Sequence, residues 1–375
     1  MENRNHLAAA IRGARERIGL TQQALASAAG FASFQIVSAI ETAQRDVKAW
    51  ELVRIARALH TSIDALLGLS EAAPARVFWR RGSRGATAEH EARLVRRAER
   101  YALLEEWNEL PPAELLPSLA LDPERASFAD AARLALTVGH TLDLGSRPAA
   151  SLLRVLEERF GVKVFHEELG GDESAACARG PFGAAVLVSA AQAPWRRNYS
   201  IAHELFHLAT WDSVEALWPA EGEPQWLERL EMLADVFAAN LLLPAAELGA
   251  QLDARAPEGD GDEGLHVIEL AREFDVSTSA LAWRLVNLGR RDAEWARRLL
   301  VDENFRRRDR LTMPARWTRP PVPFPDRYVR LALLAYEKGS LSLSRLAEFL
   351  ETSIGEVNAL IEALELGEEA AAPAP

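Results

Sequence analysis

Two histidines and a glutamate stand at a spacing that can bind a metal ion. Residues 203–207 read His-Glu-Leu-Phe-His. On a helix, positions i and i+4 lie about 40° apart on one face, so both imidazoles can bind one ion. Zinc accepts such ligands and keeps a fourth position for a water, whose pKa it lowers toward ~7. Glu204 would then take the proton of that water as general base. Two histidines that bind no metal are the alternative.

A third protein ligand must come from elsewhere in the chain. The metzincin pattern needs Gly at position 210 and His at 213, and Thr210 and Ser213 exclude that class. The helix expected at Leu227–Leu243 offers three carboxylates: Glu228, Glu231 and Asp235. We assign Glu231 as the ligand. Asp235, four residues later on the same face, is expected to accept a histidine N–H, because its apolar neighbours argue against a solvent-facing charge.

Two longer segments surround these residues. They read Tyr-Ser-Ile-Ala-His-Glu-Leu-Phe-His (199–207) and Glu-Met-Leu-Ala-Asp-Val-Phe-Ala-Ala-Asn-Leu-Leu-Leu-Pro (231–244). Together they resemble the ImmA/IrrE metallopeptidases, in which the third ligand Glu is followed by a pattern ending in Leu-Leu-Met-Pro. The resemblance covers about residues 128–290. Asp235 departs from the commoner Asn and is similar to the Glu-x-x-x-Asp arrangement of gluzincins. The resemblance implies a zinc endopeptidase that cleaves a protein, often a DNA-binding repressor, in response to stress or mobile-element signals.

The resemblance also implies roles for residues around the metal. Ala184–Ser189 would be the active-site edge strand, to which a substrate adds as an extra strand; a fully paired core strand is an equal alternative. A tetrahedral intermediate needs a hydrogen-bond donor besides zinc. The candidates, each with a structural alternative, are Tyr199, Arg196 and His166. Trp211 and Trp218 could line the cleft, or pack in a loop.

The first 70 residues have a helix-turn-helix layout. Thr21 can cap a helix and Gly30 permits a tight turn. The expected helices are Leu7–Arg17, Gln22–Ala29, Ser33–Glu41, Trp50–Leu59 and Ile63–Leu67. The segment resembles the XRE (Cro/C1-type) family, in which the second helix of the motif enters the major groove. It departs in one extra residue between Gly30 and Val37, and in Ala43 where Gly is usual.

This resemblance implies a set of DNA-contacting side chains. The groove-facing candidates are Ser33, Phe34, Gln35 and Ser38. Gln35 could pair bidentately with adenine, while Gln22 could bind a phosphate. A helical bundle that docks a protein, the substrate for example, without touching DNA is the alternative.

Charge is distributed unevenly along the chain. The net charge of −12 does not suit a nucleic-acid binder. Residues 1–70, however, hold eight Arg or Lys and six Asp or Glu, a balance of +2, and residues 71–100 add +4. The remaining 275 residues therefore carry −18. A basic N-terminal quarter joined to an acidic remainder suggests that the two parts have different functions. Arg80, Arg81 and Arg84 could add to the small positive charge of the first domain.

The length of 375 residues predicts two or three domains. We expect an α+β fold, mostly α, in four segments. Residues 1–70 form a five-helix helix-turn-helix domain, and residues 71–127 a linker with a charged helix. Residues 128–312 form a zincin-like peptidase domain with a small sheet, whose strands are expected at Val162–Phe165 and Ala184–Ser189. Residues 313–375 form a small helical module with a disordered tail from 367.

The composition excludes several classes of protein. With 49% hydrophobic and 26% charged residues, the chain is neither fibrous nor wholly disordered. It has no run of 18 uncharged apolar residues and no apolar core of a signal peptide near its N-terminus. The single cysteine, Cys177, suits a reducing cytoplasm.

The sequence therefore predicts a cytoplasmic metalloendopeptidase that uses Zn2+ and is fused to a helix-turn-helix domain. Its expected partners are a protein substrate, a DNA-binding repressor above all, and DNA through the N-terminal domain, with no membrane. One alternative is a DNA-binding transcriptional regulator that uses the zinc fold as a sensor or scaffold. Another is the antitoxin of a toxin–antitoxin pair. The oligomeric state is not read from the sequence.

Overall fold

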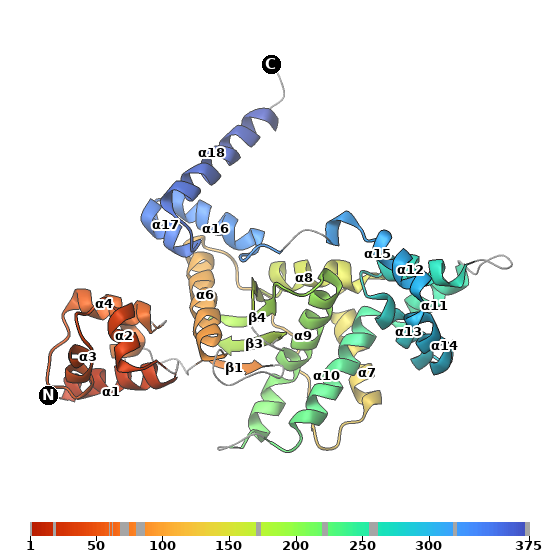
Figure 1. The fold of residues 1–375 in the computed structure, drawn as a ribbon, viewed down its shortest axis with the longest axis horizontal. Helices are drawn as coiled ribbons and strands as arrows, with labels where there is room; N and C mark the ends of the chain where they lie inside the picture. Colours follow the sequence, from red (N-terminus) through yellow and green to blue (C-terminus); the bar gives the residue numbers. More distant parts are fainter. Residues whose placement is uncertain are drawn as a thin grey trace.

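The computed structural model describes residues 2–17, 20–59, 61, 63–67, 75–79, 87–169, 174–219, 224–254, 262–317 and 321–371. The described chain is mostly helical with one four-stranded sheet, so the predicted α+β, mostly α, fold is confirmed. Figure 1 shows the N-terminal helices as a separate group, with the sheet lying between α6 and α9. The expected arginines at 80, 81 and 84 lie outside the described residues.

The N-terminal group forms a helical domain with its own core. Its helices are α1 (Glu2–Arg17), α2 (Gln22–Ala28), α3 (Phe34–Glu41), α4 (Ala49–Ala58) and α5 (Ile63–Leu67). These agree closely with the predicted helices, except that α1 begins five residues earlier. The Thr21 hydroxyl accepts the backbone N–H of Ala24 at 3.1 Å, which is the predicted cap. Apolar side chains such as Leu25, Val37 and Ile40 are buried between the helices.

The sheet contains two predicted strands and two that the sequence did not predict. The strands are β1 (Arg76–Trp79), β2 (Lys163–Glu167), β3 (Ala175–Gly180) and β4 (Gly183–Ser189), in the order β1-β3-β4-β2. β4 runs parallel to β2 and antiparallel to β3, and β1 pairs antiparallel with β3. Of the two alternatives for Ala184–Ser189, the edge strand is therefore wrong and the fully paired core strand is confirmed, in line with its apolar composition.

Four helices on one face of the sheet supply the core around the histidines. α8 (Pro148–Glu158) and α9 (Pro194–Leu217) contact the sheet, α10 (Leu227–Leu242) packs on α9, and α7 (Phe128–Thr141) packs on α10. Alternate strand side chains, including Cys177 and Val186, face these helices. Beyond them follow α11 (Ala245–Ala254), α12 (Glu263–Glu273), α13 (Thr278–Asn287), α14 (Ala293–Val301) and α15 (Glu303–Leu311), then a short 3-10 turn at Ala315–Trp317.

The other face of the sheet is covered by α6 (Thr87–Trp107), and α16 (Asp326–Glu337) packs on α6. α17 (Leu343–Phe349) follows α16, and α18 (Ile354–Ala371) extends away from the sheet (Figure 1). Side chains of α6, α16 and α17 share one buried cluster with β2, β3 and β4. Parts of the segments predicted as a linker (71–127) and as a separate module (313–375) thus share one layer against the sheet. Leu121 and Ala126, at the end of the predicted linker, pack instead in the core on the other face. The tail prediction also needs correction, because α18 continues to Ala371; residues 372–375 lie outside the described part.

Within the described residues, no single helix has the length and apolar composition needed to cross a membrane. Among the residues that the structure describes, α10 and α11 taken together have the required length and composition, but they are bent by 42° at the break between them. Much of α10 is buried in the core beside α9.

Candidate metal centre

Helix α9 carries both histidines into the interior between the sheet and α10. Pro194 stands at the start of the helix, where its missing N–H costs no hydrogen bond. His203 and Glu204 are fully buried, and His207 is 7% exposed. The i, i+4 spacing brings the two Nε2 atoms to 3.2 Å from each other, so both rings point their Nε2 at the same place.

Helix α10 brings the predicted third ligand to the same place. One oxygen of Glu231 lies 3.3 Å from Nε2 of His203, and the other lies 3.2 Å from Nε2 of His207. One possible ligand atom from each of His203, His207 and Glu231 can be chosen so that all three atoms lie within 4.8 Å of one another. Burial alone raises the pKa of Glu231, but the contacts with both imidazoles outweigh it and lower the net pKa.

Asp235, one helical turn after Glu231, contacts the other side of a histidine. Its Oδ1 lies 2.9 Å from Nδ1 of His203. A proton held at Nδ1 leaves Nε2 with a free lone pair, as a metal ligand requires. The side chain of Asp235 is 48% exposed, so it is less buried than its apolar neighbours suggested. The Tyr199 hydroxyl donates to the Asp235 backbone carbonyl at 3.0 Å and ties the two helices together.

Glu204 is a buried carboxyl group beside a weak hydrogen-bond donor, the Cys177 thiol of β3. Neither of its oxygens has a partner at ordinary hydrogen-bond geometry among the described residues. Burial raises the pKa of the Cys177 thiol. Burial also raises the pKa of Glu204, while the nearby imidazoles of His203 and His207 act in the opposite direction. Two imidazole nitrogens, a carboxylate and an adjacent unsatisfied carboxyl group fit the donor set of a catalytic zinc site.

The three predicted oxyanion residues lie in different places. Tyr199 and Arg196 line a cavity of about 420 Å³ that also includes Asp235. His166 lies on β2, at the opposite edge of the sheet from β1, so the structure does not bring it to the donor cluster. Burial lowers the pKa of His166 to about 4, with a smaller effect from the Arg197 charge.

A second cavity, of about 160 Å³, opens directly on the metal donors. It is lined by the three β1 residues Val77, Phe78 and Trp79 and by His207, Val214, Trp218, Leu227, Leu230 and Glu231. Sequence reasoning missed the β1 residues, although Val-Phe-Trp is a run of strand-forming types. Trp218, which the sequence suggested as a cleft residue, does line this cavity.

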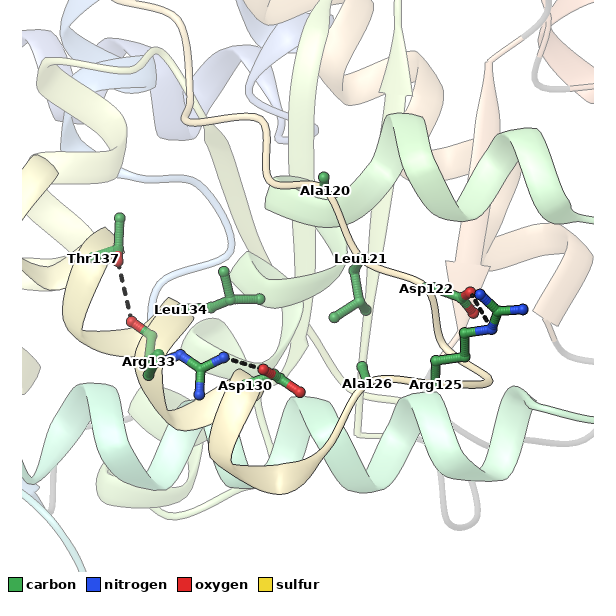
Figure 2. Close-up of a pocket in the computed structure, with 9 residues that line it drawn as sticks. All are labelled: Ala120, Leu121, Asp122, Arg125, Ala126, Asp130, Arg133, Leu134 and Thr137. Atoms are coloured by element: carbon green, nitrogen blue, oxygen red, sulfur yellow. Dashed lines mark hydrogen bonds and ion pairs between the residues drawn. The ribbon is translucent and has the colours of Figure 1, made fainter.

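A larger surface pocket lies away from these donors. It has a volume of about 510 Å³, and it is formed by α7 and the segment before it (Figure 2). Its two arginines are each paired with an aspartate of the same pocket, Arg125 with Asp122 and Arg133 with Asp130. Since their charges are compensated locally, we place no catalytic site there.

The predicted DNA-contacting residues divide into two groups. Phe34 and Gln35 are exposed at the start of α3, and Ser33 and Ser38 are half-buried. Gln22 is different, because its side-chain amide donates to Glu41 at 2.8 Å within the domain. The same carboxylate accepts from Arg15 at 2.6 Å. Gln22 therefore helps to hold α2 against α3.

Comparisons with known proteins agree with this division of the chain. The model of the IrrE N-terminal-like domain of peptidase family M78 matches residues 157–286, and a helix-turn-helix domain model matches residues 6–68. No curated protein matches the chain. One similar solved structure is a Mycobacterium tuberculosis transcriptional regulator, with 16% identity and a TM-score of 0.32. That likeness covers 50% of this chain and 51% of the regulator, about half of each, and is too weak to carry an argument. The chain therefore combines an N-terminal helix-turn-helix domain with an ImmA/IrrE-type, M78-family peptidase domain.

Proposed function

We propose that this protein is a zinc-dependent endopeptidase. One observation carries the proposal: the Glu231 carboxylate lies between the Nε2 atoms of His203 and His207, while the unpartnered Glu204 carboxyl lies beside them. A structural ion pair would explain Glu231, but it would leave the buried Glu204 with no donor stronger than the Cys177 thiol among the described residues, at a cost of ~1–3 kcal/mol. A hydrolytic site gives Glu204 a water to bind.

The roles of the residues follow from their positions. His203, His207 and Glu231 would hold the ion, and Asp235 would keep the Nδ1 proton of His203 in place. Zinc, when bound, would polarise the scissile carbonyl and favour deprotonation of the attacking water. Glu204 takes the proton from that water and returns it to the leaving amine. Arg196 remains a candidate donor to the developing oxyanion, from the cavity beside Asp235. Tyr199 would take that role only by giving up its hydrogen bond to the Asp235 carbonyl.

We infer that the substrate is a protein that presents an extended segment, and we propose a DNA-binding repressor as that protein. The extended conformation is supported by the position of the donors beside an edge of the sheet, where a peptide can add by backbone hydrogen bonds. The repressor is supported only by the resemblance of residues 199–207 and 231–244 to the ImmA/IrrE peptidases.

A second function, DNA binding, is supported by the exposed side chains of α3. Phe34 and Gln35 stand at the N-terminal end of the second motif helix, the part that contacts base edges in helix-turn-helix complexes. Gel shifts on the promoter of the protein's own gene would test this function. We expect Gln35→Ala to weaken specific binding by about 5–150-fold, a loss of ~1–3 kcal/mol. Unchanged binding would remove Gln35 from the interface.

The peptidase proposal is tested by incubation with purified candidate repressors. We expect zinc-loaded wild-type protein to produce fragments, and chelator to abolish them. Glu204→Gln should bind zinc and produce no fragments. DNA binding without proteolysis of any candidate would favour the regulator, in which the zinc fold is only a sensor or scaffold.

A further inference from the structure

Strand β1 covers an edge of the peptidase sheet, although it is not part of the matched peptidase domain. Strands β2, β3 and β4 lie within the matched residues 157–286, and β1 precedes them by more than 70 residues. β1 is the outermost strand and pairs antiparallel with β3 (Figure 1). Without β1, the backbone N–H and C=O groups on the outer edge of β3 would be unpaired and could pair with another extended chain.

The pairing register places β1 next to the residues assigned to catalysis. Phe78 lies opposite Cys177 of β3, and the Cys177 thiol lies beside the Glu204 carboxyl. Because paired residues point to the same face of a sheet, Phe78 also faces α9. The cavity that includes His207 and Glu231 is bounded on one side by β1.

The Phe78 side chain occupies an aromatic site on α9 and just beyond its end. Its ring centroid lies 4.5 Å from that of Trp211 and 4.8 Å from that of Trp218. Both tryptophans belong to the peptidase domain, whereas Phe78 belongs to the connecting strand. An aromatic side chain in this place gains favourable ring contacts that a small or charged side chain would lose.

We propose that β1 is an intramolecular occupant of the position in which an extended substrate binds. The proposal rests on the proposed peptidase function. A substrate segment displaces β1, pairs antiparallel with β3, and places a large aromatic side chain where Phe78 now lies, between Trp211 and Trp218. β1 thus limits access to the metal centre, and its residue types indicate the substrate class: an extended peptide with a central aromatic residue.

The attachments of β1 are weak enough for such an exchange. The strand has only four residues, and none of their side chains is fully buried. Arg76 pairs with Glu215 at 3.2 Å, but the two side chains are 57% and 38% exposed, so solvent screens the pair. Trp79 donates its indole N–H to Glu91 of α6 at 2.7 Å. By contrast, β4 is paired on both sides and its last five residues are buried.

The test measures peptide binding in a chain that cannot hydrolyse the probe. The probe is a fluorescein-labelled Ala-Arg-Val-Phe-Trp peptide, the sequence of residues 75–79. Full-length Glu204→Gln protein is compared with Glu204→Gln/Phe78→Ala by fluorescence anisotropy. We expect the second protein to bind the probe at least tenfold more tightly. In the absence of probe, the backbone amides of β3 should exchange hydrogen at least tenfold faster in the second protein than in the first.

Two controls make the result specific. Phe31→Ala, in the Glu204→Gln background, removes the same kind of half-buried side chain from the N-terminal domain and should leave probe affinity unchanged. A probe with Ala in place of Phe should bind at least tenfold more weakly to the Phe78→Ala protein. If Phe78→Ala fails to fold by circular dichroism, Phe78→Leu replaces it, with a smaller gain expected.

Equal probe affinity in the two folded proteins would overturn the proposal, and so would equal binding of the Ala probe. Neither outcome depends on hydrolysis, because Glu204→Gln is present throughout. Conversely, tight probe binding by a protein whose wild type cleaves no substrate would contradict the proposed peptidase function. It would still support the displacement of β1 by an extended peptide.

Discussion

The carboxylate of Asp235 lies 2.9 Å from Nδ1 of His203, on the side of the ring away from Glu231. Glu231 and Asp235 are one turn apart on α10, so a single helix supplies both a donor on Nε2 and an acceptor on Nδ1. The ring is held between them, which fixes both its orientation and the nitrogen that carries the proton.

We expect Asp235→Ala to weaken zinc binding by about 10–100-fold, because the His203 ring loses the acceptor that orients it. The measurement is zinc affinity by competition with a chromophoric chelator. Asp212→Ala is the matched control, since Asp212 lies on α9 but its exposed carboxylate pairs with Arg179. Equal affinities in the two variants would show that the contact with His203 does not contribute to metal binding.

Glu204→Gln should lower the rate of cleavage by about 10²–10⁴-fold while zinc remains bound, because the amide cannot take the proton of the attacking water. Cleavage is followed by gel on whichever repressor proves to be a substrate, and zinc is measured on the same samples. Glu124→Gln, at an exposed position before α7, is the control. A Glu204→Gln protein as active as wild type would exclude Glu204 as the general base.

Glu157 makes stability depend on pH. Burial raises its pKa to about 8, which the Arg327 charge partly opposes and the charges of Asp326 and Glu158 support. Between pH 4.5 and 8 the native state keeps a proton that the unfolded state releases, so stability falls as pH rises through this range. Glu157→Gln should remove that fall and stabilise the chain at pH 8 by a few kcal/mol, on the order of 1.4 kcal/mol per pKa unit.

Urea unfolding at pH 5 and pH 8 checks this expectation. Glu124→Gln is the control, because Glu124 is an exposed carboxylate before α7 and does not contribute to the raised pKa of Glu157. If Glu157→Gln and wild type lose the same stability between the two pH values, Glu157 is ionised in the native state.

Ala43→Gly should stabilise the N-terminal domain. Ala43 has a φ of 56° after α3, a conformation that costs a residue with a Cβ about 1 kcal/mol and glycine little. We expect a higher transition temperature for this domain by calorimetry. Ala32→Gly, an exposed alanine with no positive φ, should instead be neutral or destabilising. A lower transition temperature for Ala43→Gly would contradict the account.

The sequence was informative where spacing alone decides geometry. The i, i+4 rule placed His203 and His207 on one face, and the carboxylates of the later helix were few enough to select Glu231. Thr21, Gly30 and the apolar periodicity predicted the N-terminal helices. Ala43, noted only as a departure from a usual Gly, lies at a position where the backbone does favour Gly.

The sequence was uninformative where long-range pairing decides the structure. β3 is alanine-rich and has no β-branched residue, so its composition does not favour a strand. β1 is short and lies in a stretch that reads as a linker, and only β3 makes it a strand. Because both strands were missed, the sequence could not decide whether Ala184–Ser189 is an edge strand or is paired on both sides. The layer formed by α6 and α16 was likewise divided between two predicted segments.

The central claim is that His203, His207 and Glu231 hold one zinc ion. The most direct test is the zinc content per chain, measured by elemental analysis after loading and desalting. We predict about one zinc per wild-type chain and less than a tenth of that for Glu231→Ala with its fold intact, since two imidazoles alone bind weakly. Equal zinc contents in the two proteins would contradict the account.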